Sequence, residues 1–176
     1  MIQTPVAVAI LDNHDVIVAD DYHVQQFDQA GRPLAVVGGY NLKPAGVADT
    51  KLGFVAVADK ELRTVRFFHD RGPEVLFASR WPERLFGMPS GLAVVKSTGN
   101  VVVVDAERRT VSVHALTTRP PSAAVPLYTI PSTHFANPTH IAVDDSGRIF
   151  VSDAQLMCIK VTNFFGFLKY LISARI

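Results

Sequence analysis

The sequence has little cysteine, little net charge and no long uninterrupted apolar run. Its single cysteine, Cys158, cannot form an internal disulfide or a cysteine-rich zinc module such as a RING finger, so we expect a reducing, cytoplasmic compartment. The 17 Lys and Arg nearly balance the 16 Asp and Glu, which excludes a strong overall attraction to nucleic acid or anionic lipid. The apolar tail at 164–176 is interrupted by Lys169 and Arg175 and is shorter than the roughly 20 residues that span a bilayer. We therefore expect a strand there and no membrane segment.

The sequence contains one pattern four times. Each copy begins with Pro, reaches a branched aliphatic residue and Ala, passes through a turn, and ends a β-rich run in Asp. The copies are PVAVAILDNHDVIVAD (5–20), PAGVADTKLGFVAVAD (44–59), PSGLAVVKSTGNVVVVD (89–105) and PTHIAVDDSGRIFVSD (138–153). Their terminal aspartates recur at spacings of 39, 46 and 48 residues, which suit one four-stranded propeller blade. These aspartates are Asp20, Asp59, Asp105 and Asp153.

The residue types within each copy agree with a propeller blade. The first strands are rich in Ala and Gly, as the crowded space near a propeller axis requires. The second strands, such as 101–104 and 149–151, are apolar on both faces, which is typical of a sheet between two others. The sequence therefore predicts an all-β protein, one β-propeller region over residues 1–176 with about four blades. Its repeats lie near 5–40, 44–85, 89–132 and 138–172.

The pattern resembles the NHL repeat, whose usual form is close to P-x-G-I-A-V-D, a short turn, G-x-I-x-V-A-D and then N-x-R-I-x-V-F. The copy at 138–153 is the nearest match. The resemblance implies a propeller of the kind found in tripartite-motif and malin-like ubiquitin ligases and in translational repressors, where NHL propellers bind proteins or RNA. The Asn that usually follows the Asp is missing in every copy, so no ligand contact is carried over.

The number of copies is smaller than the resemblance implies, because NHL propellers generally have five or six blades. Four copies predict an incomplete or open ring. Such a ring fits a fragment, a reduced family member, or half of an assembly that closes by self-association. An open arc also leaves the faces of its terminal blades uncovered.

The exposed candidates for binding fall on one rim of the propeller. Because strands in a blade alternate in direction, the turn after each second strand lies beside the segment that enters each first strand. The candidate binding residues on this modestly basic rim are Lys43, Lys60, Arg63, Arg80, Trp81, Arg84, Arg108 and Arg109. Arg and Trp are typical anchors for a protein partner, and they can also contact phosphate and stack on the bases of single-stranded RNA. The alternative is that the charges are solvated and that Trp81 packs between blades.

Other residues that could carry chemistry have structural explanations. The terminal aspartates can accept hydrogen bonds from the turns that follow them. Cys158 fits a small core position in the β pattern MCIKV. The six histidines form no short metal-ligand spacing, and neither a G-x-S-x-G elbow, a P-loop nor H-E-x-x-H occurs, so the sequence predicts no catalytic residue, cofactor or metal. The phenylalanines expected in the core between blades are Phe67, Phe68, Phe77, Phe86, Phe164, Phe165 and Phe167.

These observations favour a non-catalytic platform that binds a protein partner. The resemblance adds a setting, the substrate-recognition part of a ubiquitin ligase system. Two alternatives stay open. One is single-stranded RNA binding on the same rim, and the other is a metal-dependent propeller hydrolase or lyase that assembles its ligands around the axis from distant repeats.

Overall fold

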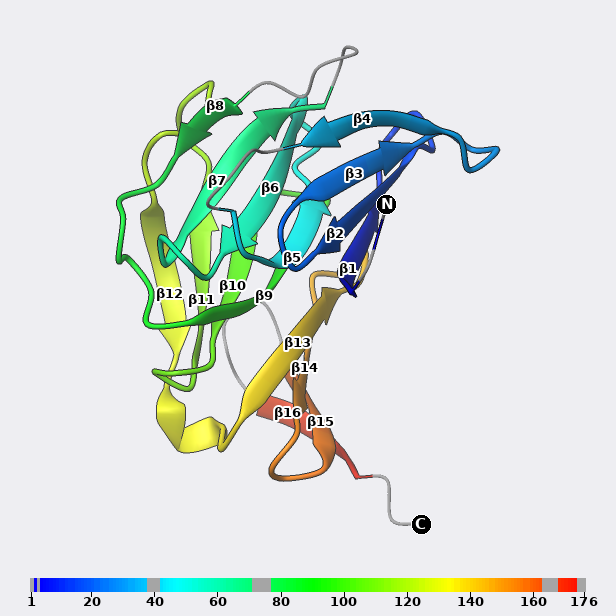
Figure 1. The fold of residues 1–176 in the computed structure, drawn as a ribbon. Helices are drawn as coiled ribbons and strands as arrows, with labels where there is room; N and C mark the ends of the chain where they lie inside the picture. The colour runs from blue at the N-terminus through cyan, green and yellow to red at the C-terminus, as the bar shows by residue number, and fades with distance from the viewer. Residues whose placement is uncertain (1, 3, 38–41, 71–76, 163–167, 174–176) are drawn as a thin grey trace.

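The computed structural model describes residues 2, 4–37, 42–70, 77–162 and 168–173. These residues form four antiparallel sheets of four strands each, and the strands of a sheet follow one another in chain order. The sheets are arranged around a common centre as the blades of a β-propeller, which confirms the predicted all-β fold (Figure 1). In the part of the chain that the structure describes, no helix is long and apolar enough to cross a membrane.

Each blade runs from its inner strand to its outer strand. Blade 1 consists of β1 (Pro5–Ile10), β2 (Val16–Asp20), β3 (Val24–Phe27) and β4 (Pro33–Val37). Blade 2 consists of β5 (Pro44–Asp49), β6 (Phe54–Asp59), β7 (Thr64–His69) and β8 (Phe77–Arg80). Blade 3 consists of β9 (Pro89–Val94), β10 (Val101–Asp105), β11 (Thr110–Ala115) and β12 (Val125–Ile130). Blade 4 follows the short 3-10 helix η1 (Ser132–His134) and consists of β13 (Pro138–Val143), β14 (Ile149–Asp153), β15 (Cys158–Thr162) and β16 (Leu168–Ser173).

The repeated Pro-to-Asp pattern forms the inner hairpin of each blade. The Pro that begins an inner strand is the register partner of the Asp that ends the second strand, as with Pro44 and Asp59 or Pro138 and Asp153. Proline lacks the N–H that a ladder needs and is tolerated where an edge strand begins. The inner strand is the edge of its sheet. The same pairing therefore recurs in all four blades.

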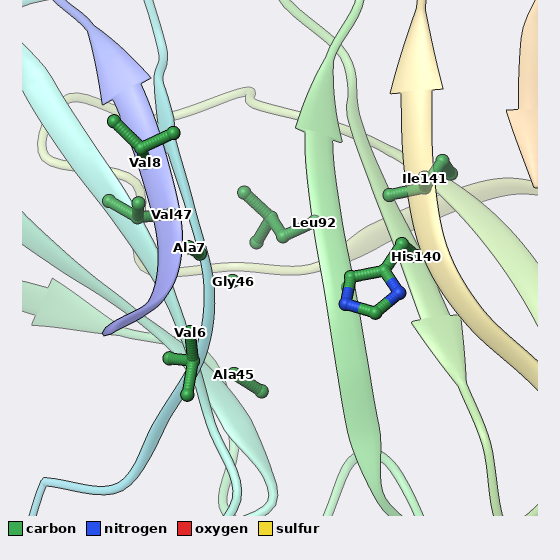
Figure 2. A pocket seen from close by; sticks show the side chains of 10 residues that line it. Val6, Ala7, Val8, Ala45, Gly46, Val47, Leu92, His140 and Ile141 are labelled. Atoms are coloured by element: carbon green, nitrogen blue, oxygen red, sulfur yellow. The ribbon is translucent and has the colours of Figure 1, made fainter. Parts of the chain in front are cut away.

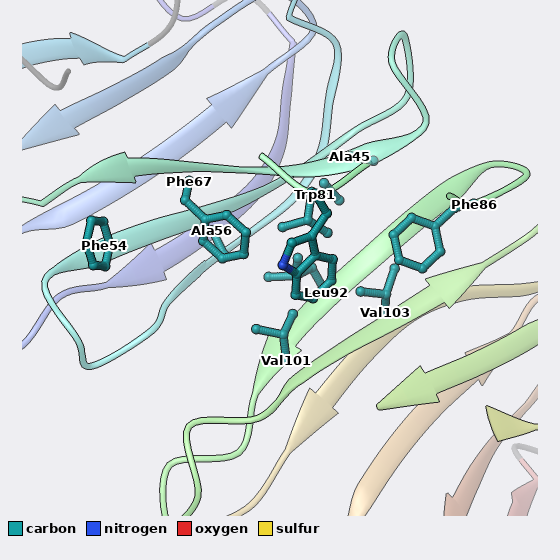
Figure 3. Close-up of a cluster of buried hydrophobic side chains, with 11 residues drawn as sticks. Ala45, Phe54, Ala56, Phe67, Trp81, Phe86, Leu92, Val101 and Val103 are labelled. Atoms are coloured by element: carbon teal, nitrogen blue, oxygen red, sulfur yellow. The ribbon is translucent and has the colours of Figure 1, made fainter. Parts of the chain in front are cut away.

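Neighbouring blades are held together by apolar side chains between their sheets. The inner strand β1 packs against β5, β5 against β9, and β9 against β13. Between blades 2 and 3, Phe67, Trp81, Phe86 and Leu92 share one cluster with Val103 (Figure 3). Burying each such side chain stabilises the folded chain by about 1.5 to 3 kcal/mol, and this burial holds the blades face to face.

The ring is open in the part of the chain that the structure describes. On blade 1, Val8 is 65% exposed, Ile10 63% and Val36 55%, because no blade lies in front of this sheet. On blade 4, Ile159 is 40% exposed. The four blades therefore form an arc with two uncovered terminal faces, in agreement with the predicted open ring.

The phenylalanines follow the prediction with one correction. Phe67, Phe68 and Phe86 are at most 4% exposed and belong to the core. Phe77 was expected there but is 49% exposed, since it begins the outermost strand of blade 2, where its ring contacts Phe68 edge-on and the guanidinium of Arg66. Phe164, Phe165 and Phe167 lie outside the described residues. Cys158 is buried, with a free thiol.

Candidate functional site

The terminal aspartates hold the turns of the rim in position. The carboxylate of Asp105 accepts N–H bonds from Gly87 at 2.7 Å, Met88 at 3.0 Å and Arg108 at 3.0 Å. It thereby joins the segment that enters blade 3 to the turn that follows β10. The other three also accept hydrogen bonds from turn amides, and each of the four is at most 2% exposed; they are Asp20, Asp59 and Asp153.

The hydrogen bonds at Asp153 also affect its pKa. Burial raises the pKa of Asp153, but the N–H groups of Ala136, Leu156 and Asn137 and the nearby Lys160 charge together lower it more. The pKa of Asp153 therefore lies below its ordinary value, and the carboxylate stays ionised.

Three of the predicted binding residues come together where blades 2 and 3 meet. The N–H of Arg84 donates to Leu62 O at 3.0 Å, and the N–H of Phe86 donates to Arg63 O at 3.1 Å, so the segment after β8 is fastened to the turn before β7. Arg108 then donates from Nη1 to Leu85 O at 2.7 Å. We call the exposed surface of Arg63, Arg84, Leu85, Glu107 and Arg108 the rim patch.

The rim patch is basic but partly neutralised. Arg63 Nη1 lies 3.8 Å from Glu107 Oε2, across the junction between the two blades, and both side chains are about half exposed. Arg108 Nε lies 3.7 Å from the buried Asp105. The exposed Arg63–Glu107 pair contributes about 0 to 1 kcal/mol, so Arg63 can exchange this partner for a group on a bound protein.

The remaining predicted cations lie around the rim patch. Lys43 is ion-paired with Glu61 at 3.0 Å, which raises the pKa of Lys43, and the N–H of Lys60 donates to Lys43 O. Arg109 is exposed in the same turn as Arg108. Arg80 is farther out, at the end of the outer strand β8, where it pairs with Glu83 at 2.7 Å.

Trp81 is not part of the rim surface, which corrects its place among the predicted binding residues. It is 1% exposed and packs edge-on against Phe67 at 5.4 Å between ring centroids and beside Phe86 at 6.4 Å (Figure 3). The backbone N–H of Trp81 donates to Val65 O at 3.0 Å, just after β8 ends. Packing between blades, the alternative reading of this residue, is what the structure shows.

A pocket of about 370 Å³ opens beside the rim patch, and sequence reasoning missed it. It lies against the outer strands of blade 3, with Arg108 and Leu85 at its edge and Phe86 on its wall. Its other lining residues come from β11 and β12 and the segment before β12; they are Thr110, Ser112, His114, Ala124, Pro126 and Thr129 with Asp105. The alternation in 110–115 could have placed Ser112 and His114 on one face, but no sequence signal shows that the blade 2 segment folds against them.

His114 is the one histidine among the residues that line this pocket. Its Nε2 lies 2.9 Å from Ser112 Oγ, and its ring packs against both Trp81 and Phe86, at 5.0 and 5.7 Å between centroids. Burial lowers the pKa of His114 to about 4, so the imidazole is neutral at pH 7. The pocket therefore offers an apolar interior with hydroxyl groups and the neutral His114, next to the cationic Arg108 and the carboxylate of Asp105.

A second pocket, of about 200 Å³, lies between the four inner strands (Figure 2). It is lined by small and aliphatic side chains such as Ala7, Gly46 and Leu92, and by His140 of β13. Among the described residues no three His, Cys, Asp or Glu side chains are grouped so that they could hold a metal ion.

Comparison with known proteins gives one relative by sequence. NHL-repeat-containing protein 4 of Homo sapiens is 32% identical over 95 residues, which are 52% of this chain and 73% of that protein. No protein-family model matches the chain.

Solved structures share the fold at low sequence identity. A protein of unknown function from Bacteroides caccae superimposes with a TM-score of 0.70 at 14% identity, over 97% of this chain and 61% of that one. Hydrazine synthase of Kuenenia stuttgartiensis has a TM-score of 0.73 at 12% identity, over 97% and 49%, and a streptogramin B lyase 0.71 at 14%, over 94% and 53%. The chain thus spans about half to three fifths of these structures, and at such identities the likeness concerns the fold alone.

Proposed function

Because this chain belongs to the NHL-repeat family, we propose that it is a non-catalytic platform whose rim patch binds a protein partner. The observation that carries this proposal is that the turns bearing Arg63, Arg84 and Arg108 meet at one junction between blades, where Arg108 lines the pocket of about 370 Å³. Arginine at the edge of a pocket that takes an apolar side chain is typical of the energetic centre of a protein interface. The partner expected here has an acidic segment with one apolar anchor.

We extend this proposal to substrate recognition within a ubiquitin ligase system, in a reducing, cytoplasmic compartment. The support for this setting is the family and the single cysteine, which is free. The ligase activity itself would come from a RING-bearing segment or partner.

Single-stranded RNA on the same rim is the weaker candidate. RNA affinity depends on cations that neutralise successive phosphates, and here Arg63, Lys43 and Arg80 each face a glutamate. Trp81 cannot provide a stacking face for RNA because it is buried, whereas Tyr22, in the turn after β2, is exposed.

The test is capture of proteins from a cell extract by the immobilised chain. In the patch variant, Arg63, Arg84 and Arg108 are each changed to Glu. We expect specific protein capture to fall at least tenfold, since repulsion replaces the arginine contacts. The control variant changes Arg32, Lys96 and Arg148 to Glu, which applies the same change in charge to the hairpins on the opposite rim.

The result that would overturn the proposal is equal capture by the patch variant and the wild-type chain. Capture that disappears after ribonuclease treatment and at moderate salt would instead support RNA as the ligand. Melting temperatures of both variants, measured by circular dichroism, show that the loss of capture is not a loss of fold.

A further inference from the structure

Every junction between blades is built from the same two kinds of face. We call the face that packs on the following blade the front face and the face that packs on the preceding blade the rear face. In the second strands the alternation is regular: Ala56 and Ala58 of β6 face blade 3, whereas Val55 and Val57 face blade 1. Among the residues that the structure describes, no blade packs on the rear face of blade 1 or on the front face of blade 4.

The front faces of blades 2 and 3 leave little or no room for a side chain at one position of the inner strand. This position is two residues after the Pro that begins the strand. A Cβ added to Gly46 would lie 2.8 Å from the backbone N of Leu92, and a Cβ added to Gly91 would lie 3.1 Å from Thr139 O. Since backbone atoms of the following blade occupy the space, a larger residue there would push the two blades apart.

Blade 4 has a histidine at this position. His140 follows Pro138 by two residues, as Gly46 follows Pro44. Its side chain is exposed and lines both the pocket between the inner strands (Figure 2) and a shallow groove of about 190 Å³ on the front face of blade 4. On blade 1 the position holds Ala7, which still packs into the junction with blade 2.

A second feature makes this front face unlike the others. Ser152 stands where blades 1 to 3 have the fully buried Ala19, Ala58 and Val104. Its hydroxyl accepts the N–H of His140 at 3.1 Å and lies 2.9 Å from Thr139 Oγ1. The inner part of this front face is therefore polar and already hydrogen-bonded within the blade.

We propose that His140 is a steric stop that keeps blade 4 from packing on a further blade, including blade 1 of a second copy of this chain. The rear face of blade 1, with Val8 and Ile10, is the docking surface that takes a further propeller blade, and the blade that fits carries Gly or Ala at the position of His140. Without the stop, the two ends of the arc are complementary in type, and head-to-tail association would give larger rings or filaments.

The test uses the chain itself as the probe. The wild-type chain is expected to be monomeric by light scattering coupled to size-exclusion chromatography. His140→Gly and His140→Ala supply a front face like those of blades 3 and 1, and they are expected to associate at concentrations at least tenfold lower than the wild-type chain. Adding Val8→Lys to either variant blocks the docking surface and restores the monomer.

Ala142→Gly is the matched control, because it places a new glycine on the same strand and front face but leaves His140 in place. It is expected to stay monomeric. A wild-type chain that already associates through Val8, or His140→Gly and His140→Ala variants that fold yet remain monomeric, would overturn the proposal. Circular dichroism melting separates association from unfolding in each variant.

Discussion

The rear faces of blade 1 and blade 2 have the same residue types at the same places but opposite environments. Val8 of β1 and Val47 of β5 both stand three residues after the first Pro, yet Val8 is 65% exposed and Val47 is 5% exposed. The difference arises because blade 1 covers blade 2 and nothing in the described chain covers blade 1. An apolar pattern therefore identifies a blade, while coverage by a neighbour decides how much stability each side chain contributes.

The largest effect is expected when a histidine, which blade 4 has at position 140, is introduced at the equivalent position of a closed junction. Gly46→His is expected to lower the free energy of unfolding by about 3 kcal/mol, because the side chain would meet the backbone of Leu92. Chemical denaturation measures the change. Ala142→His, which adds the same side chain to the uncovered front face of blade 4, is expected to have little effect. Equal losses in both variants would contradict the difference between the two faces.

A smaller difference in stability is expected between Ala substitutions at two equivalent valines, one covered by a neighbouring blade and one not. Val57 and Val18 both precede the terminal Asp by two residues, but Val57 is fully buried and Val18 is only partly buried. Val57→Ala is expected to lower the free energy of unfolding by about 2 kcal/mol, through lost burial and a residual cavity. Val18→Ala is expected to cost less than about 1 kcal/mol. A second chain or blade that covers Val18 in solution would raise the smaller value toward the larger one.

The smallest expected effect is a pH dependence of stability that arises at the closed junction between blades 2 and 3. Burial lowers the pKa of His114 in the folded chain to about 4, so below pH 6.5 the unfolded chain takes up a proton that the folded chain does not. Stability is therefore expected to fall by about 1 kcal/mol between pH 7 and pH 5.5 on account of this residue. His114→Phe should remove that part of the pH dependence.

If His114→Phe and the wild-type chain lose stability in parallel, the acid sensitivity comes from other groups and the neutral state of His114 is not its cause.

Much of the fold was predictable because blade structure is local. The Pro-to-Asp pattern specifies an inner hairpin, and the alternation of β-branched residues specifies two apolar faces, so the repeats predict four blades without any long-range information. The prediction that Phe77 lies in the core was wrong because it rested on the same local strand pattern. A strand pattern shows that a residue lies in a blade, but it does not show whether another strand or blade covers its outer side.

For the candidate site, the sequence predicted which turns carry the arginines but not which of these turns come together. The sequence places Arg63, Arg84 and Arg108 on one rim, and the structure brings them to the same junction through backbone hydrogen bonds between separate segments. It also turns Trp81 away from that surface and opens a pocket against His114. These features depend on how the segment between β8 and β9 crosses from blade 2 to blade 3, and that segment has no repeated pattern.

By itself the sequence determined the repeat, the type of blade and the residues that face each side of every sheet, because strand pairing and alternation act between neighbours in the chain. Only the tertiary structure decided which faces are covered, which arginine-bearing turns meet, and that a Cβ at position 46 or 91 would crowd the backbone of the next blade whereas His140 is exposed. Those outcomes depend on distances of closest approach between blades, and residues that are far apart in the chain set these distances.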